Sequence, residues 1–199
     1  MHDSDSEHQA LRDAWEHARD GDDAERHACT LTALTDYLQT HDRLNAALDV
    51  FREGLTVSGD RADVALEITC RYGLAAIGLA QNDFPSARAE LTAGASLAAV
   101  SGDLAGQARM MALWGRVEMA SGDLNRAAEV LATAKGLAEI GGLSDLLCRV
   151  QISEADIHIL SGRQDVAAAH LKVALQSATD RGDTTALAAL EAKLAEVDG

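Results

Sequence analysis

Histidine, cysteine and the carboxylates are the residue types that could hold a metal or carry acid–base chemistry. The chain has seven histidines, which include His8, His17, His27 and His41 near its start. No H-E-x-x-H sequence and no tight His/Asp spacing occurs that would place two metal ligands on one helical face. We therefore predict no metal site.

The three cysteines do not form a chemical motif. Cys29, Cys70 and Cys148 are odd in number, lie far apart and include no C-x-x-C pair. A disulfide framework needs paired cysteines, and a zinc site needs closely spaced ones. We expect small, reduced and buried thiols, which is how free cysteine usually behaves.

Motifs that activate a nucleophile or bind a phosphate are also absent from the sequence. There is no G-x-S-x-G, no Walker loop and no G-x-G-x-x-G. We therefore predict that the protein is not an enzyme, has no catalytic residue and requires no cofactor.

The charge of the chain excludes two classes of partner. Seventeen basic and 32 acidic side chains give a net charge of −15, which repels nucleic-acid phosphates and anionic lipid headgroups. The polar N-terminus has no apolar segment behind a basic one, and no apolar run approaches the roughly 18 residues of a membrane span. We predict a cytoplasmic protein that binds neither nucleic acid nor membrane.

Small and large apolar residues recur every 40 residues. The repeated small residues are Ala47, Ala87, Ala127 and Ala167, and the large residues four places later are Phe51, Leu91, Leu131 and Leu171. A third column holds small residues at Gly54, Gly94, Ala134 and Ala174. Regular self-similarity over 20–50 residues is typical of a solenoid, whose units bury their apolar faces against their neighbours.

Turn dipeptides divide each repeat into two helices. They recur about every 20 residues, as in Gly102-Asp103 and Gly122-Asp123, and less regularly at Gly59-Asp60. Glycine can close one helix in the left-handed conformation, and aspartate can accept the free N–H groups that open the next. The expected helices cover residues 5–20, 23–40, 43–57, 61–81, 84–100, 103–120, 123–140, 143–160, 163–180 and 183–197.

The columns resemble those of the tetratricopeptide repeat (TPR) family, whose second helices carry an Ala, large, Ala series. The small site of the family's first helix falls at Ala75, Gly115 and Ala155. The family's usual period is about 34 residues, so the chain resembles its longer variants in sensor regions of bacterial regulators and in adaptors. HEAT repeats, which share the 40-residue period, are the competing assignment.

The resemblance implies an all-α, right-handed α-α superhelix of about ten antiparallel helices. We expect residues 1–6 to be a disordered tail and residues 7–197 to form one domain. Four full repeats would cover 22–181, between half repeats at 7–20 and 183–197.

The family binds peptides or partner helices in a concave groove lined by its first helices. The groove columns carried over to this sequence include Tyr72, Arg109, Arg116, Met119, Arg149, Ile152, Asp156 and Ile159. The three arginines could accept the carboxylates of an acidic peptide, because a guanidinium group binds carboxylates in a bidentate manner. In the alternative interpretation, Arg116 pairs with Asp156 and the other two arginines are solvated.

The resemblance favours a non-enzymatic protein-interaction scaffold that binds a protein or peptide segment. One alternative is a signal- or ligand-sensing module of a larger bacterial regulator. Another is a homo-oligomer, in which apolar residues of the terminal half repeats, including Trp15 and Leu190, would lack a neighbour and assemble with another copy.

Overall fold

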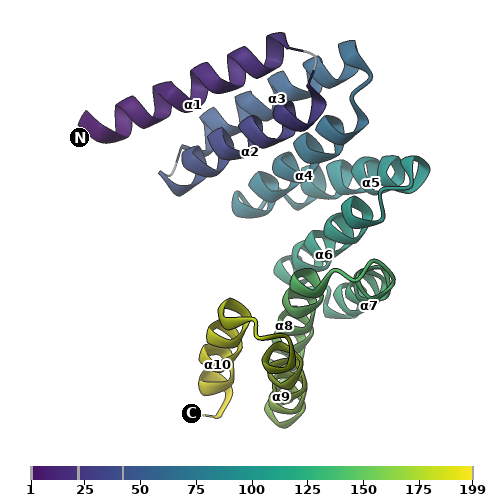
Figure 1. Ribbon diagram of the computed structural model, residues 1–199. Coiled ribbons are helices and arrows are strands. Elements are labelled where there is room, and N and C mark those ends of the chain that lie inside the picture. The colour runs from purple at the N-terminus through teal and green to yellow at the C-terminus, as the bar shows by residue number, and fades with distance from the viewer. Residues whose placement is uncertain (1, 22, 42, 199) are drawn as a thin grey trace. The chain divides into compact units, whose positions relative to one another are not determined.

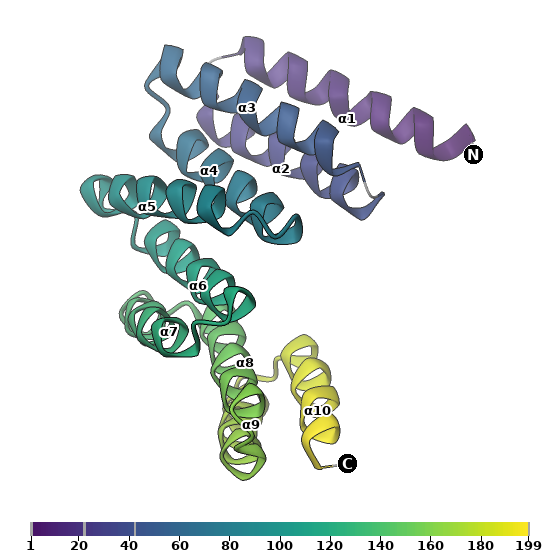
Figure 2. The ribbon, with the colours of Figure 1, turned by 180° about the vertical axis from the view of Figure 1, so that it is seen from behind.

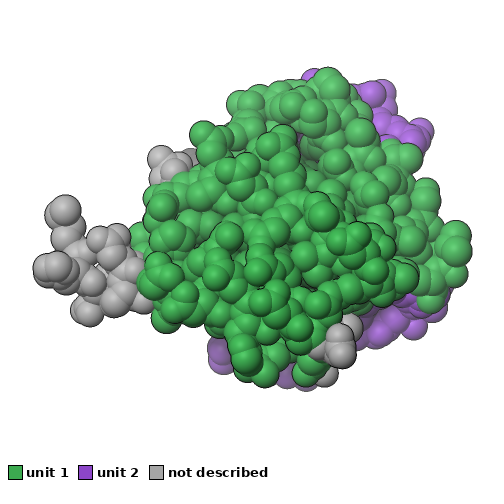
Figure 3. Space-filling view, turned by 90° about the horizontal axis from the view of Figure 1, so that it is seen from above, with its two compact units in different colours: residues 1–101 green, residues 102–199 purple. Residues whose placement is uncertain are grey.

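The computed structural model describes residues 2–21, 23–41 and 43–198. These residues form ten helices and no strand (Figure 1). The chain divides into two compact units, residues 1–101 and residues 102–199, which Figure 3 distinguishes by colour. The prediction of an all-α helical repeat is confirmed, whereas one domain over 7–197 and a disordered tail over 1–6 stay predictions.

The first unit, residues 1–101, contains five helices. They are α1 (His2–Asp20), α2 (Ala24–Thr40), α3 (Leu44–Arg61), α4 (Val64–Ala80) and α5 (Phe84–Ser101). Each helix contacts the next along the chain, and α2 also contacts α4. The pairs α2–α3 and α4–α5 correspond to the first two expected repeats, and α1 to the leading half repeat.

The second unit, residues 102–199, also contains five helices, but its half repeat comes last (Figure 2). Its helices are α6 (Leu104–Ser121), α7 (Leu124–Ile140), α8 (Ser144–Leu160), α9 (Gln164–Arg181) and α10 (Thr184–Asp198). Here too each helix contacts the next, and the first helices of successive repeats contact each other, α6 with α8 and α8 with α10. The face made by α6, α8 and α10 is therefore continuous within this unit.

The helix ends follow a step of 20 residues. A left-handed residue stands at Ala62, Asn82, Gly102, Gly122, Gly142, Gly162 and Gly182. The residue that follows is often an aspartate whose carboxylate accepts a backbone N–H of the next helix, as Asp123 does from Arg126 at 2.9 Å. Such a cap stabilises a helix by about 1 kcal/mol.

One expected helix end is wrong. The dipeptide Gly59-Asp60 lies inside the last turn of α3, which continues to Arg61. The turn is made instead by Ala62, with a φ of 54°, and by Asp63, which caps α4. The 20-residue step placed the turn more accurately than the local Gly-Asp signal, because packing against neighbouring helices outweighs the helix-breaking tendency of one glycine.

The 40-residue columns form the core. Ala47, Ala87, Ala127 and Ala167 are all fully buried, and the large residues four places after them are at most 4% exposed. Small residues let the helices approach closely, and the larger ones fill the space beside them. The predicted register is thus confirmed.

The ends of the two units cover their own apolar residues. Trp15 in α1 and Leu190 in α10 are both 0% exposed, so the expectation that they lack a neighbour is wrong. They are covered because α1 packs on α2 and α10 packs on α8 and α9. These two residues are therefore not available to bind another copy of the chain. The oligomeric state itself stays a prediction.

Candidate partner-binding groove

The face of α6, α8 and α10 carries two hollows. The α6–α8 hollow has a volume of about 470 Å³ and is lined by Ala105, Arg109, Gly142, Leu143, Ser144, Asp145, Leu146 and Arg149. The α8–α10 hollow has a volume of about 460 Å³ and is lined by Asp145, Cys148, Arg149, Ile152, Asp183, Thr185, Ala186 and Ala189. Asp145 and Arg149 border both hollows, which therefore adjoin along α8.

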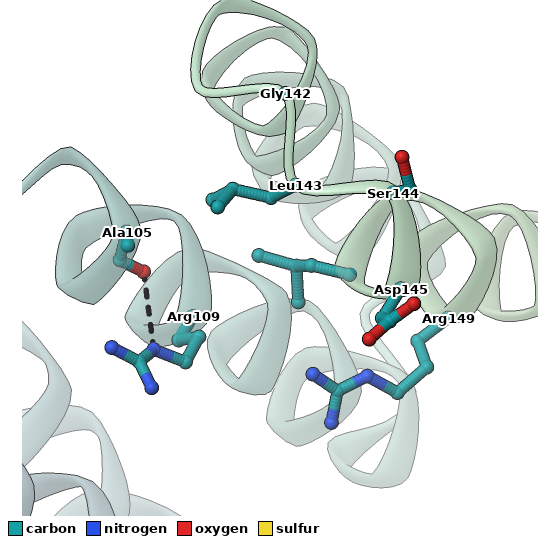
Figure 4. Close-up of a pocket in the computed structure, with 8 residues that line it drawn as sticks. Ala105, Arg109, Gly142, Leu143, Ser144, Asp145 and Arg149 are labelled. Carbon is teal, nitrogen blue, oxygen red and sulfur yellow. Dashed lines mark hydrogen bonds between the residues drawn. The ribbon is translucent and has the colours of Figure 1, made fainter.

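Two exposed arginines face the α6–α8 hollow, one from each helix. Figure 4 shows the guanidinium groups of Arg109 and Arg149 extending to the same side, while the Ser144 hydroxyl points away from them. Arg109 Nε donates a hydrogen bond to the carbonyl oxygen of Ala105 at 3.3 Å, which leaves its two terminal nitrogens facing outward. Within the described parts of the chain neither arginine forms an ion pair.

The ion pair expected between Arg116 and Asp156 is not formed among the described residues. The Asp156 carboxylate instead receives Lys193 Nζ from α10 at 2.8 Å, and Lys193 also reaches Glu196 at 3.2 Å. Hydrogen bonding to Asp156 raises the pKa of Lys193. Arg116 remains exposed on α6.

The remaining predicted site residues are partly accessible. Met119 on α6 and Ile152 and Ile159 on α8 are half-buried, and they pack at the edges of the core clusters of their unit. Tyr72 lies half-buried on α4 in the first unit. The structure thus brings Arg109, Arg149 and Ile152 together around the two hollows.

Several lining residues were missed by the sequence reasoning. They are Leu143, Ser144 and Asp145 at the start of α8, and Asp183, Thr185, Ala186 and Ala189 at the start of α10. A signal for them was present, because positions 105, 145 and 185 and positions 109, 149 and 189 continue the same 40-residue step. The columns were simply not extended into the last half repeat.

The described residues were predicted to hold neither a metal site nor a membrane span. No three His, Cys, Asp or Glu side chains of the described residues gather in a way that could hold a metal ion. None of the helices described is both long enough and apolar enough to cross a bilayer.

Comparison with known proteins identifies the fold. No family model matches the sequence, and a comparison with curated proteins gives no match. Aspartyl phosphate phosphatase F of Bacillus subtilis has a similar structure, with a TM-score of 0.74 and 16% identity over 86% of this chain and 45% of its own. This chain therefore spans less than half the length of that protein.

Two further solved structures show the same arrangement of helices. The apo form of RapI matches with a TM-score of 0.60 and 12% identity over 96% of this chain and 73% of its own. A Podosopora anserina protein described as a kinesin light chain with nearly identical TPR-like repeats matches with a TM-score of 0.60 and 13% identity, over 92% of this chain and 99% of its own. Of the two repeat types that the sequence left open, the fold is the TPR-like one.

Proposed function

We propose that this chain is a non-enzymatic protein-interaction module that binds an acidic segment of a partner protein on the face of α6 and α8. The observation that carries the proposal is the pair formed by Arg109 and Arg149. Both are exposed, both line one hollow, and neither has an ion-pair partner in the part of the chain that the structure describes.

The charge balance of the molecule supports this proposal. Acidic side chains outnumber basic ones by 15 over the whole chain, and several arginines are paired with a carboxylate. Arg71, for example, donates to both Glu67 and Glu90, and Arg12 to Glu16 and Glu53. Arg109 and Arg149 form no such pair among the described residues, even though Asp145 lines the same hollow. Their guanidinium groups are therefore available to accept a carboxylate from a partner in a bidentate pair.

The fold supports binding by a surface of this kind. In stacked helical repeats the extended surface formed by successive units is the part of the molecule available for recognition. The name of aspartyl phosphate phosphatase F denotes an activity, so hydrolysis of acyl phosphates by this chain would contradict the non-enzymatic part of the proposal.

Fluorescence anisotropy with short labelled peptides rich in Glu tests the proposal. Arg109→Ala and Arg149→Ala should each weaken binding roughly tenfold or more, because a hydrogen bond to a charged group contributes about 1.5–3 kcal/mol. Rising salt should weaken binding of the wild type. Peptides with Gln in place of Glu should bind weakly to all variants.

Arg126→Ala is the matched control. Arg126 is an exposed arginine of the same unit, on α7, and it is held by Glu129 at 2.9 Å. Its loss changes the net charge by the same amount but should leave the affinity within about twofold, since surface ion pairs contribute little. Equal effects of Arg126→Ala and Arg109→Ala would show that only the overall charge matters and would contradict the proposed site.

A further inference from the structure

The two hollows occupy equivalent positions in successive repeats. Positions 105 and 145 line the first hollow, and positions 145 and 185 line the second. Positions 109 and 149, and then 149 and 189, follow in the same way, one helical turn further along. The volumes of about 470 and 460 Å³ agree with this equivalence.

The equivalent hollows differ in chemistry. The first is flanked by an arginine on both sides, whereas the second has Arg149 on one side and Ala189 on the other. Ile152, Ala186 and the buried Cys148 add an apolar wall to the second hollow. Burial raises the pKa of the Cys148 thiol, so this side chain stays uncharged and contributes to the apolar surface.

A carboxylate found only at the second hollow disfavours an acidic side chain there. Asp183 lines the second hollow and not the first, whereas Asp145 lines both. Asp183 caps α10 by accepting the backbone N–H of Ala186 at 2.9 Å, which keeps its carboxylate at the helix start beside the hollow. A second carboxylate from a partner would be repelled, while an apolar side chain would be accepted by Ile152 and the two alanines.

We propose that the hollows are two consecutive subsites for one partner segment, with an acidic side chain in the α6–α8 hollow and a Leu-, Ile- or Met-sized side chain in the α8–α10 hollow. Arg149 borders both subsites and so fixes the order of the two side chains. This inference rests on the proposed function and adds to it a two-residue recognition pattern, acidic then apolar, with a defined direction along α6, α8 and α10.

Exchange of one residue should give the second subsite the arginine pair of the first. Ala189 occupies the column of Arg109 and Arg149 and is exposed, so Ala189→Arg can be introduced without disturbing the core. Labelled peptides containing one Glu and one Leu, at spacings of one to four residues, and the matched peptides with two Glu residues provide the probes. The wild type should prefer the Glu/Leu peptides, and Ala189→Arg should shift the ratio of the two affinities towards the Glu/Glu peptides by about tenfold or more.

Ala188→Arg is the matched control, because Ala188 is an exposed neighbour on α10 that does not line the hollow. It adds the same charge and should leave the ratio of the two affinities unchanged. The inference is overturned if the two arginine variants behave alike, or if replacing Leu by Ser in the peptide leaves wild-type affinity unchanged.

The two levels of the proposal fail in different ways. Loss of binding in Arg109→Ala together with indifference to the Leu residue overturns the second subsite but leaves the proposed function intact. Glu/Leu binding that ignores Arg109→Ala overturns the proposed function itself and, with it, the assignment of the two subsites. Circular dichroism of each variant confirms that its helices are retained.

Discussion

The two compact units share one pattern of burial but differ in the chemistry of their first helices. In residues 102–199 the exposed columns of α6 and α8 carry Arg109, Arg116 and Arg149. In residues 1–101 the equivalent positions of α2 and α4 are Cys29, Asp36, Thr69 and Ala76, none of which is basic. The 40-residue step therefore determines which positions are buried and leaves the exposed positions free to acquire different binding chemistry.

The units also differ in how their glycines are packed. A Cβ atom on Gly73 would collide with the Phe51 ring, which comes from the preceding repeat. A Cβ atom on Gly115 would lie 2.5 Å from Leu131, which belongs to the same repeat. The tightest contact of this kind thus joins two repeats in the first unit, whereas in the second it joins the two helices of one repeat.

The largest expected effect comes from filling the space at these glycines. Gly73→Ala should destabilise the protein by about 2–3 kcal/mol and Gly115→Ala by less, because a leucine side chain can move aside more easily than a rigid ring. Urea unfolding of both variants measures the difference.

Phe51→Leu, which gives this column the leucine of the other repeats, should rescue Gly73→Ala. A double-mutant cycle should show a coupling free energy of about 1 kcal/mol or more. Additive effects would mean that the ring does not limit the space at Gly73.

A smaller effect is expected at the turns. In the first unit the left-handed position is held by Ala62 and Asn82, whereas in the second unit it is always glycine. Ala62→Gly should stabilise the protein by about 1 kcal/mol, since a residue with a Cβ atom is strained at a φ of 54°. Gly122→Ala, at a φ of 90°, should cost about as much.

Thermal unfolding of these two variants tests whether the turns of the first unit are the weaker ones. Gly59→Ala is a suitable control, because a Cβ atom there has no neighbouring atom within 4 Å and the residue is helical. A destabilising Ala62→Gly would contradict the expected strain.

The smallest effect is a dependence on pH that arises in the second unit. Burial lowers the pKa of His158 below 6.5, and the nearby His170 and Arg163 lower it further, against a rise from Glu154. The folded chain therefore binds this proton less readily than the unfolded chain. Above pH 6.5 protonation of His158 does not reduce the free energy of unfolding. This free energy falls as the pH drops from 6.5 towards the lower pKa of His158 in the folded chain.

His158→Gln should reduce the loss of unfolding free energy that is measured between about pH 7.5 and pH 5.5. His17→Gln, at an exposed position of α1 in the first unit, provides the control and should leave the pH dependence unchanged. An unaltered pH dependence in His158→Gln would show that His158 is not the group responsible.

The fold was predictable from the sequence to within a few residues because its units repeat. Burial of Ala127 and Leu131 follows from the equivalent residues 40 positions away. Each helix is therefore predicted by the same pattern in several repeats. The error at Gly59-Asp60 arose where a local turn signal was preferred to the period. The turn is made by Ala62, which has a left-handed conformation. Alanine rarely adopts this conformation, so its presence in the sequence does not predict a turn.

The candidate site was predictable only in part. Arg109 and Arg149 follow from the columns, but the partner of Asp156 does not. Lys193 pairs with Asp156 from another helix, and the sequence offered more than one basic side chain as a partner for this carboxylate. Which long, flexible side chain reaches a given carboxylate depends on tertiary geometry rather than on spacing along the chain. The second hollow was missed because the groove columns were not extended into the half repeat that contains α10.

The regular turns also have a practical consequence for protein engineering. Five turn glycines of the second unit are exposed, and a Cβ atom on any of these five would meet no neighbouring atom within 4 Å. They are Gly102, Gly122, Gly142, Gly162 and Gly182. Exposed loop tips of this kind tolerate inserted domains and new chain termini. Each of these turns is therefore a place where a fluorescent reporter could be inserted or the chain circularly permuted while every helix is kept whole.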